Sequence, residues 1–290
     1  MRIFLTLLLA ALFCSAAVFS ENAASASTQG ANTWIAQGLR PESGVVEGFY
    51  GRPWTEAERR MMLHFLGEHG MNLYVYAPKD DPYHREKWRE PYPSQEMLAL
   101  KRLAAEARTA GVEMVFAVSP GLDLRFSGWA GEADEKAMLR KLESVHAMGV
   151  ERFAIFFDDI ERKDGRAQAL FVNRLNKELL TRRLTEKPLL VVPTEYFLQD
   201  MKTAGVAKSY TREFAAQLDD DIVVLFTGEG VVPEGISAED MAEAERLYGR
   251  PLGVWWNYPV TDYLPGKLAL GPVQGLDETV AERAPVFLMN

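Results

Sequence analysis

The chain has 290 residues, of which 48% are hydrophobic and 25% are charged. This composition is ordinary for a folded globular protein, and the length suffices for one large domain or two small ones. The formal net charge of −9 disfavours nucleic acids and anionic membrane surfaces as partners, because both bind a positively charged protein face.

The first twenty residues have the pattern of a secretory signal peptide. A basic second residue is followed by an apolar run over residues 3–13 and then by small residues, with cleavage predicted after Ser20 or after Ala26. The apolar run is short for a membrane span, so an uncleaved anchor is the weaker alternative. We therefore predict a signal peptide over residues 1–20, a secreted or periplasmic protein, and no stable membrane insertion after cleavage.

Residues 21–40 are rich in Ala, Ser, Asn and Gln and are predicted to form a flexible leader. The one cysteine, Cys14, lies in the signal peptide, so the mature chain would have no disulfide, thiol nucleophile or cysteine metal site. Residues 41–290 show no convincing internal boundary, and we predict a single large domain that is stabilised by its core.

From Gly44 onward, short β-rich runs alternate with helical patterns. Several of these runs are continuously apolar, as expected for strands that are buried on both faces of a parallel sheet. The predicted strands cover residues 45–49, 73–77, 113–118, 152–157, 189–193, 222–226, 252–256 and 285–289.

Helix start and stop signals lie between the predicted strands. Thr55 and Glu58 have the spacing of a capping box, and Phe65 belongs to the apolar face predicted for the helix that follows. Ser237 is predicted to begin a later helix that ends at Gly249.

Strict alternation of strands and helices predicts a parallel sheet, either closed or doubly wound. Eight strands favour the closed (β/α)8 TIM barrel. The alternative is a Rossmann-type sheet, but no G-x-G-x-x-G phosphate motif follows a strand. Because the sequence ends with the eighth strand, the barrel is expected to lack or truncate its last helix.

The carboxyl ends of barrel strands, with the loops that follow, are where catalytic groups lie in such folds. Aromatic rings stack on the apolar faces of sugars, while carboxylates and amides bind ring hydroxyls. Side chains of both kinds, together with one lysine, lie at the ends of the predicted strands or just after them: Tyr50, Lys79, Asp158, Asp159, Tyr196, Trp255, Asn257 and Asp262. This mixture predicts a carbohydrate pocket and fits a phosphate or nucleotide site less well.

Asp158 and Asp159 directly follow an apolar strand and are the strongest catalytic candidates. Like charges held close together do not both ionise freely, so one group can donate a proton while the other stays an anion. Glycoside cleavage needs this division of labour. A simple loop cap is one alternative and a divalent metal site is another, but no further Asp, Glu or His stands at ligand spacing, so no metal is predicted.

Other candidates are weaker. The four histidines show no metal-binding pattern, and three of them, His64, His69 and His146, lie in predicted helices and are expected at the surface. For Asp80 and Asp81, which share a loop with the candidate lysine, a local structural role and a catalytic role both stay open.

Several motifs, in order along the chain, resemble glycoside hydrolase family 84, the family of the O-GlcNAcases and of bacterial hyaluronidase-type β-N-acetylglucosaminidases. They are the segments 48–54 (GFYGRPW), 76–83 (YAPKDDPY), 157–161 (FDDIE), 193–196 (PTEY) and 256–259 (WNYP). The resemblance covers residues 44–290 and implies a barrel enzyme that needs no cofactor.

The resemblance also implies a mechanism. In this family the 2-acetamido oxygen of the substrate attacks the anomeric carbon and forms an oxazoline, so the sugar itself supplies the nucleophile. Asp158 would orient and polarise the acetamido N–H. Asp159 would protonate the leaving oxygen as general acid and then activate water. Because no enzyme nucleophile is needed, adjacent carboxylates can serve.

The rest of the pocket follows from the same resemblance. Groups expected to bind sugar hydroxyls or to contact the ring are Gly48, Lys79, Asn257, Asp262 and Asn290. Tyr196 is expected to hydrogen-bond near the acetamido group. Tyr50, Thr227 and Trp255 would form the walls of the acetamido pocket, with Val231 near its entrance.

The sequence therefore predicts a retaining exo-β-N-acetylglucosaminidase that acts on an N-acetylglucosamine-containing glycan or glycoprotein. Two alternatives stay open: a non-catalytic N-acetylglucosamine-binding barrel, and an endo-acting hydrolase of hyaluronan or another glycan. The added domains of many larger relatives are not expected in a chain of this length, so the natural aglycone stays open as well.

Overall fold

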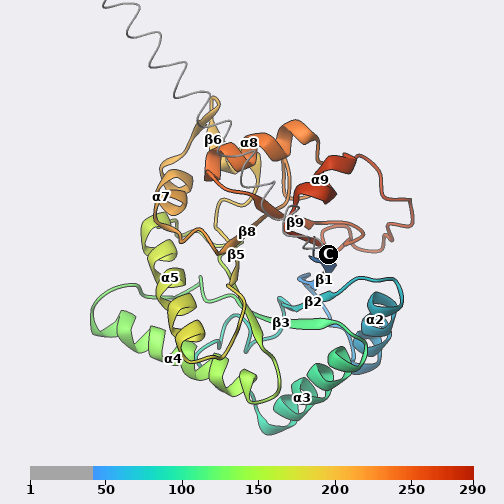
Figure 1. Ribbon diagram of the computed structural model, residues 1–290, viewed down its shortest axis with the longest axis vertical. Coiled ribbons are helices and arrows are strands. Elements are labelled where there is room, and N and C mark those ends of the chain that lie inside the picture. Colours follow the sequence, from blue (N-terminus) through green and yellow to red (C-terminus); the bar gives the residue numbers. More distant parts are fainter. Residues whose placement is uncertain (1–41) are drawn as a thin grey trace, which may run out of the picture.

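The computed structural model describes residues 42–290, so the predicted signal peptide and leader lie outside the described residues. Eight parallel strands form a closed barrel in the order β1-β10-β9-β8-β5-β4-β3-β2, with helices around the outside (Figure 1). The predicted (β/α)8 TIM barrel is confirmed. Its strands are β1 (Glu42–Glu47), β2 (Leu73–Tyr76), β3 (Glu113–Val118), β4 (Arg152–Phe156), β5 (Leu190–Val192), β8 (Val223–Phe226), β9 (Leu252–Trp256) and β10 (Val286–Met289).

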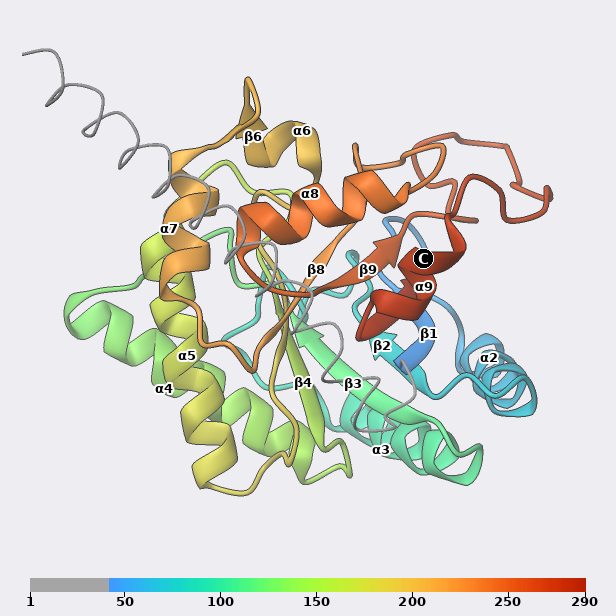
Figure 2. The same cartoon turned by 45° about the horizontal axis from the view of Figure 1, so that its top comes forward.

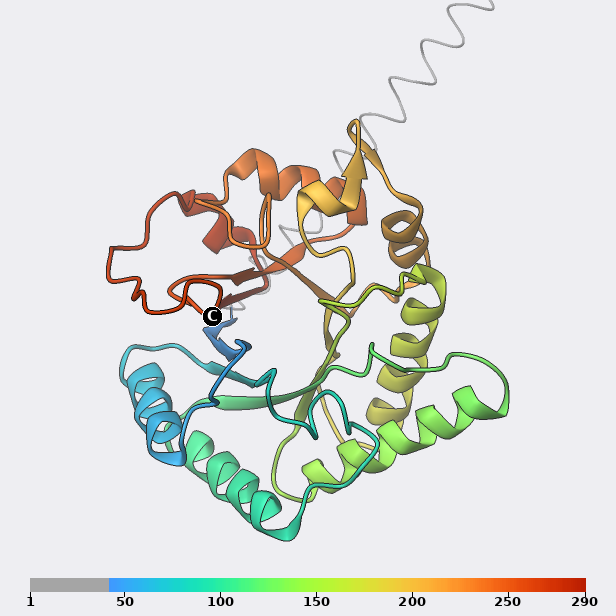
Figure 3. The same ribbon diagram turned by 180° about the vertical axis from the view of Figure 1, so that it is seen from behind.

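Each barrel strand is connected to the next by at least one helix (Figure 3). In the part of the chain that the structure describes, no helix has the length and apolarity needed to cross a membrane. The helices are α2 (Glu56–Glu68), α3 (Ser94–Thr109), α4 (Gly128–His146), α5 (Gly165–Thr181), α6 (Leu198–Met201), α7 (Ser209–Gln217), α8 (Ala238–Tyr248) and α9 (Glu278–Arg283).

The barrel closes where β1 pairs with β10, the last element of the sequence. Asn290 follows β10 directly, and the end of the chain lies beside β1 in Figures 1 and 3. A doubly wound sheet is open and has two edge strands, whereas every strand of this barrel pairs with a neighbour on both sides, so that alternative is excluded.

Strand burial on two faces explains the continuous apolar runs in the sequence. In β2, Leu73 and Val75 point into the barrel interior, while Tyr74 and Tyr76 pack in the layer between strands and helices. Successive side chains of a strand point to opposite faces, so a strand with two buried faces has no polar alternation.

The barrel interior is filled by side chains and is not a pore. Near its carboxyl end, the rings of Phe156 and Trp255 meet edge to face with their centroids 5.3 Å apart. Above these rings the interior layer gives way to polar groups, which is where the site begins.

Helix boundaries agree with the predicted signals in two well-defined cases. Thr55 and Glu58 form a reciprocal capping box at the start of α2. Ser237 caps α8, which ends at the left-handed Gly249 with φ 67°. The buried face of α2 contains Leu63 and Leu66, of which Leu66 was predicted. The prediction that Phe65 belongs to this face is wrong, because Phe65 is 47% exposed and stacks on His69 at the surface.

The connection after β5 contains a short hairpin that was not predicted. Strands β6 (Lys202–Thr203) and β7 (Val206–Ala207) pair antiparallel between α6 and α7 (Figure 2). Ala204 and Gly205 make the turn with positive φ angles of 49° and 77°. Two-residue strands are too short to give a periodic signal.

Candidate active site

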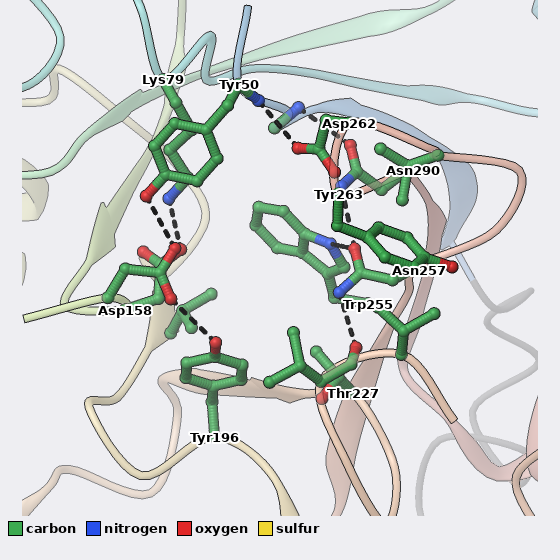
Figure 4. Close-up of a pocket in the computed structure, with 16 residues that line it drawn as sticks. Tyr50, Lys79, Asp158, Tyr196, Thr227, Trp255, Asn257, Asp262, Tyr263 and Asn290 are labelled. Carbon is green, nitrogen blue, oxygen red and sulfur yellow. Dashed lines mark hydrogen bonds and ion pairs between the residues drawn. The ribbon is translucent and has the colours of Figure 1, made fainter. Parts of the chain in front are cut away.

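A cavity of about 360 Å³ lies at the carboxyl ends of the barrel strands (Figure 4). Its volume falls in the range of small-molecule sites. Every residue that the sequence placed in the site lines it: Gly48, Tyr50, Lys79, Asp158, Asp159, Tyr196, Thr227, Val231, Trp255, Asn257, Asp262 and Asn290. The structure thus brings these residues together, while the role of each one stays a prediction. Four more residues complete the lining: Val192, Val232, Val260 and Tyr263.

Lys79 and Asp158 form a buried ion pair on one wall of the cavity (Figure 4). Their side chains are only 2% and 9% exposed, and the ammonium group donates a hydrogen bond to Oδ2 of the carboxylate. The other oxygen, Asp158 Oδ1, is buried and has no hydrogen-bond partner within residues 42–290. A buried carboxylate oxygen without a partner is a ready acceptor for an N–H or O–H group of a ligand.

Asp159 is exposed and has a left-handed backbone with φ 54°. Successive residues of an extended chain point to opposite sides, so a continued strand would separate the two carboxyl groups. The left-handed turn lets both aspartates line one cavity. This backbone costs about 1–2 kcal/mol for most residues, and aspartate is among the few side chains that adopt it often.

Two tyrosine hydroxyls donate to the two carboxylate oxygens of Asp159. The Tyr50 hydroxyl lies 2.8 Å from Oδ2, and the Tyr196 hydroxyl lies 2.9 Å from Oδ1. Burial raises the pKa of Tyr50 to about 12, and burial followed by the negative charge of Asp159 raises the pKa of Tyr196. Both phenols therefore stay protonated and act as donors at neutral pH. Within the described barrel no hydrogen bond joins Asp159 to Asp158, so each carboxyl group is held by its own partners.

On the cavity wall opposite the Lys79–Asp158 pair, amide side chains that follow β9 and β10 connect these strands to the end of β1. Asn257 Oδ1 accepts hydrogen bonds from Trp255 Nε1 and from Asn290 Nδ2, both at 2.8 Å. Asn290 Oδ1 in turn accepts from the backbone N–H of Gly48 at 3.1 Å, and Asn257 Nδ2 donates to the carbonyl of Val231 at 2.7 Å. The amide network fixes the orientation of the indole that forms the cavity floor.

Asp262 and Thr227 complete the polar lining. Asp262 Oδ2 accepts from the backbone N–H of Tyr50 at 2.9 Å, which ties the loop after β9 to the loop after β1. Thr227 Oγ1 donates to the carbonyl of Gly230 at 2.7 Å, so its methyl-bearing side is left for the cavity wall. In Figure 4, Asp262 and Asn257 lie across the cavity from Asp158.

Gly48 lies directly against the indole of Trp255. A Cβ atom built at this glycine would lie 2.3 Å from Trp255 Cζ2, far inside van der Waals contact. Only glycine fits at this position unless the indole moves.

The sequence that folds into this barrel matches a known protein family. Residues 43–290 match the family model described as NAGidase, beta-N-acetylglucosaminidase. The chain belongs to this β-N-acetylglucosaminidase family. Since a family model covers nearly all the described residues, the resemblance to glycoside hydrolase family 84 that the motifs suggested is confirmed.

Relatives within the β-N-acetylglucosaminidase family are longer than this chain. Protein O-GlcNAcase of Rattus norvegicus is 34% identical over 278 residues, which is 93% of this chain and 30% of the relative. Protein O-GlcNAcase of Mus musculus is 34% identical over 254 residues, which is 85% of this chain and 27% of the relative. The chain thus spans less than a third of the length of these curated relatives.

Solved structures show the same barrel. The structure of CpGH84B has a TM-score of 0.83 and 48% identity, covering 86% of this chain and 44% of that one. A mutant of the Thermobaculum terrenum O-GlcNAc hydrolase has a TM-score of 0.80 and 32% identity, covering 87% of this chain and 55% of that one.

Two neighbours of the predicted catalytic pair, Asp158 and Asp159, were not themselves predicted. Arg85 donates to the Tyr50 hydroxyl and to the backbone carbonyl of Asp159. His84 is fully buried with Nδ1 2.7 Å from the carbonyl of Ala117, and burial lowers its pKa to about 4. The available signal was their position in the loop after β2, a place where barrel residues reach the site.

The aspartates beside Lys79 do not line this cavity and accept hydrogen bonds from neighbouring parts of the barrel. Asp81 accepts hydrogen bonds from the hydroxyls of Tyr76 and Tyr92, both at 2.7 Å, and Asp80 accepts from the N–H of Gly51 at 3.1 Å. Over residues 42–290, no group of three or more His, Cys, Asp or Glu side chains is placed to hold a metal ion.

Proposed function

We propose that this chain hydrolyses terminal, β-linked N-acetylglucosamine with retention of configuration, using the acetamido group of the substrate as the nucleophile. The observation that supports this most directly is the free, buried Oδ1 of Asp158 in the wall of a sugar-sized cavity. Beside it, Asp159 is exposed and can exchange a proton with a leaving group or with water. Family membership and the O-GlcNAcase relatives support the same activity.

In the first step, Asp158 Oδ1 accepts the acetamido N–H and thereby makes the acetamido oxygen more nucleophilic. That oxygen attacks the anomeric carbon, the bond from this carbon to the aglycone oxygen breaks, and Asp159 transfers its proton to the departing oxygen. Lys79 stays paired with Asp158 Oδ2, so the negative charge that stabilises the developing oxazolinium is held in place.

In the second step, Asp159 is a carboxylate and accepts a proton from water. The water oxygen bonds to the anomeric carbon while the bond to the acetamido oxygen breaks, which regenerates the acetamide and retains the configuration. Tyr50 and Tyr196 donate to the two carboxylate oxygens of Asp159 and suit this charged form.

The remaining wall is proposed to hold the sugar ring. Asp262 and Asn257 supply acceptors and a donor for hydroxyl groups, and Trp255 supplies an apolar face for the acetamido methyl and the ring. The proposed substrate is an N-acetylglucosamine-containing glycan or glycoprotein. We also propose that the protein is exported, on the basis of the signal pattern in residues 1–20.

The test is hydrolysis of aryl N-acetyl-β-glucosaminides by the purified chain. Asp159→Asn is expected to be impaired most with poor leaving groups, and Asp158→Asn is expected to slow oxazoline formation with every leaving group. Activity is expected to survive EDTA. Wild-type rates in both Asp158→Ala and Asp159→Ala would rule the mechanism out.

Product sizing on a natural glycan decides between exo and endo action. Release of the monosaccharide alone supports the proposed exo mode, whereas oligosaccharide products indicate an endo-acting hydrolase. Binding of N-acetylglucosamine in calorimetry without any turnover would instead indicate a sugar-binding barrel.

A further inference from the structure

Arg85 lies behind the proposed general acid without touching the cavity. It comes from the loop after β2, its residue is 9% exposed, and it is not among the residues that line the site. Its guanidinium Nη1 donates to the Tyr50 hydroxyl at 2.6 Å, and its Nη2 donates to the backbone carbonyl of Asp159 at 3.1 Å. One planar group thus holds both the side chain that binds the general acid and the backbone that orients it.

The hydrogen bond from Arg85 to the Tyr50 hydroxyl fixes the direction of the hydrogen bond between Tyr50 and Asp159. A guanidinium has donors only, and a phenol has a single proton. Because the Tyr50 oxygen accepts from Arg85, its own proton is free to point to Asp159 Oδ2, 2.8 Å away. Without Arg85, the Tyr50 hydroxyl, which belongs to a 43% exposed residue, could turn its proton to water.

The second hydrogen bond holds an unfavourable backbone conformation. Asp159 has φ 54°, and this turn is what places its carboxyl group in the same cavity as Asp158. A non-glycine residue in the left-handed region keeps that conformation only when surrounding contacts stabilise it. The hydrogen bond from Arg85 to the Asp159 carbonyl is such a contact, and it bridges 74 residues of sequence.

We propose that Arg85 is a positioning residue for proton transfer by Asp159, acting through the Tyr50 hydroxyl and the Asp159 carbonyl. The inference rests on the proposed function, because it assumes that Asp159 protonates the leaving oxygen. Lysine cannot replace arginine in this role, since an ammonium is a point charge and lacks the planar fork that reaches two acceptors.

The test compares two substrates that differ in their need for an acid. The phenyl glycoside of N-acetylglucosamine needs protonation of its leaving oxygen, whereas the 2,4-dinitrophenyl glycoside leaves as a stable anion. In Arg85→Lys, kcat/KM is expected to fall about tenfold or more for the phenyl substrate, within the about 10²–10⁴-fold that a positioned general acid contributes. For the dinitrophenyl substrate the fall is expected to stay below about threefold.

A matched control separates positioning from loss of stability. Arg89 is in the same loop and binds Asp134 and Asp123 away from the site, so Arg89→Lys is expected to lower the melting temperature and to affect both substrates equally. Arg85→Ala adds a second measurement: millimolar guanidinium should restore turnover of the phenyl substrate selectively.

Each outcome decides the question. A selective loss with the phenyl substrate, or selective rescue by guanidinium, supports the positioning role. An equal loss with both substrates, or no loss with either, overturns it. If the wild-type chain hydrolyses neither substrate, the proposed function itself fails, and that result is distinct from failure of the Arg85 inference.

Discussion

Removing the charge of Lys79 tests whether the buried ion pair is organised as described. In Lys79→Met, the side chain keeps a similar size but can no longer donate a hydrogen bond. Asp158 would then lose the one hydrogen bond that it accepts within the described residues, because its Oδ1 already has no partner. A carboxylate whose side chain is 9% exposed would be left without compensation.

The expected cost follows from that burial. Removing one partner of a buried ion pair destabilises a protein by about 3–5 kcal/mol, because the other charge is left uncompensated. For a domain of this size, each kcal/mol lowers the melting temperature by about 2–4 °C, so a fall of roughly 6–20 °C is expected. Had the pair been at the surface, the cost would be about 0–1 kcal/mol.

Urea-induced and thermal unfolding of four proteins measure this cost: wild type, Lys79→Met, Asp158→Asn and the double variant. The double variant is expected to be clearly more stable than Lys79→Met, because it no longer contains an unpaired buried carboxylate. A loss below about 1 kcal/mol in Lys79→Met, or additive losses in the double variant, would refute the burial argument. The assay needs no substrate, so its result does not depend on the proposed activity.

Three further changes have defined outcomes. The pKa of His84 lies at about 4 when folded against an ordinary value of 6.5, so its stabilising contribution is complete above pH 6.5 and is lost as the pH falls through 4. We expect the free energy of unfolding to fall by about 3 kcal/mol over that window in urea titrations, and His84→Asn to remove this part of the pH dependence. Tyr196→Phe deletes the donor to Asp159 Oδ1 and should lower kcat/KM about 10–150-fold with a phenyl leaving group, since hydrogen bonds to charged groups contribute about 1.5–3 kcal/mol. An unchanged rate would show that this hydrogen bond does not contribute to catalysis. Phe156→Ala should lower the free energy of unfolding in denaturant by about 3–5 kcal/mol, because it leaves a void beneath Trp255. Phe65→Ala, at an exposed position, should lower it by under about 1 kcal/mol. Equal losses would contradict the placement of Phe156 in the barrel interior.

Apolar periodicity was sufficient to predict the barrel because most of its strands are buried on both faces. The boundaries of β3 and β9 were predicted correctly, but β1 begins earlier than expected, at Glu42. Its first residues are polar because Glu42 pairs with Arg152 and Lys187 at the amino end of the barrel. Apolar patterns do not detect a strand that starts in a salt-bridge network.

The location of the site was predictable, but the contacts inside it were not. The rule that chemistry lies at the carboxyl ends of barrel strands brought together residues that the cavity indeed gathers. The left-handed turn at Asp159 gave no such signal, because aspartate is common in ordinary loops. Arg85 was missed since its two acceptors are 35 and 74 residues away in sequence, and only the folded chain selects them.

The close contact between Gly48 and Trp255 has a consequence for how substrate preference could diverge among descendants of this protein. A side chain at this glycine would overlap the indole of Trp255, so a substitution there would displace one side of the cavity before it could adjust selectivity. We therefore expect new selectivity to arise at the exposed rim of the cavity, where Val231, Val232 and Tyr263 are 41%, 39% and 51% exposed and can vary in size. We expect laboratory evolution toward bulkier ligands to accumulate its changes at that rim and to leave the glycine untouched.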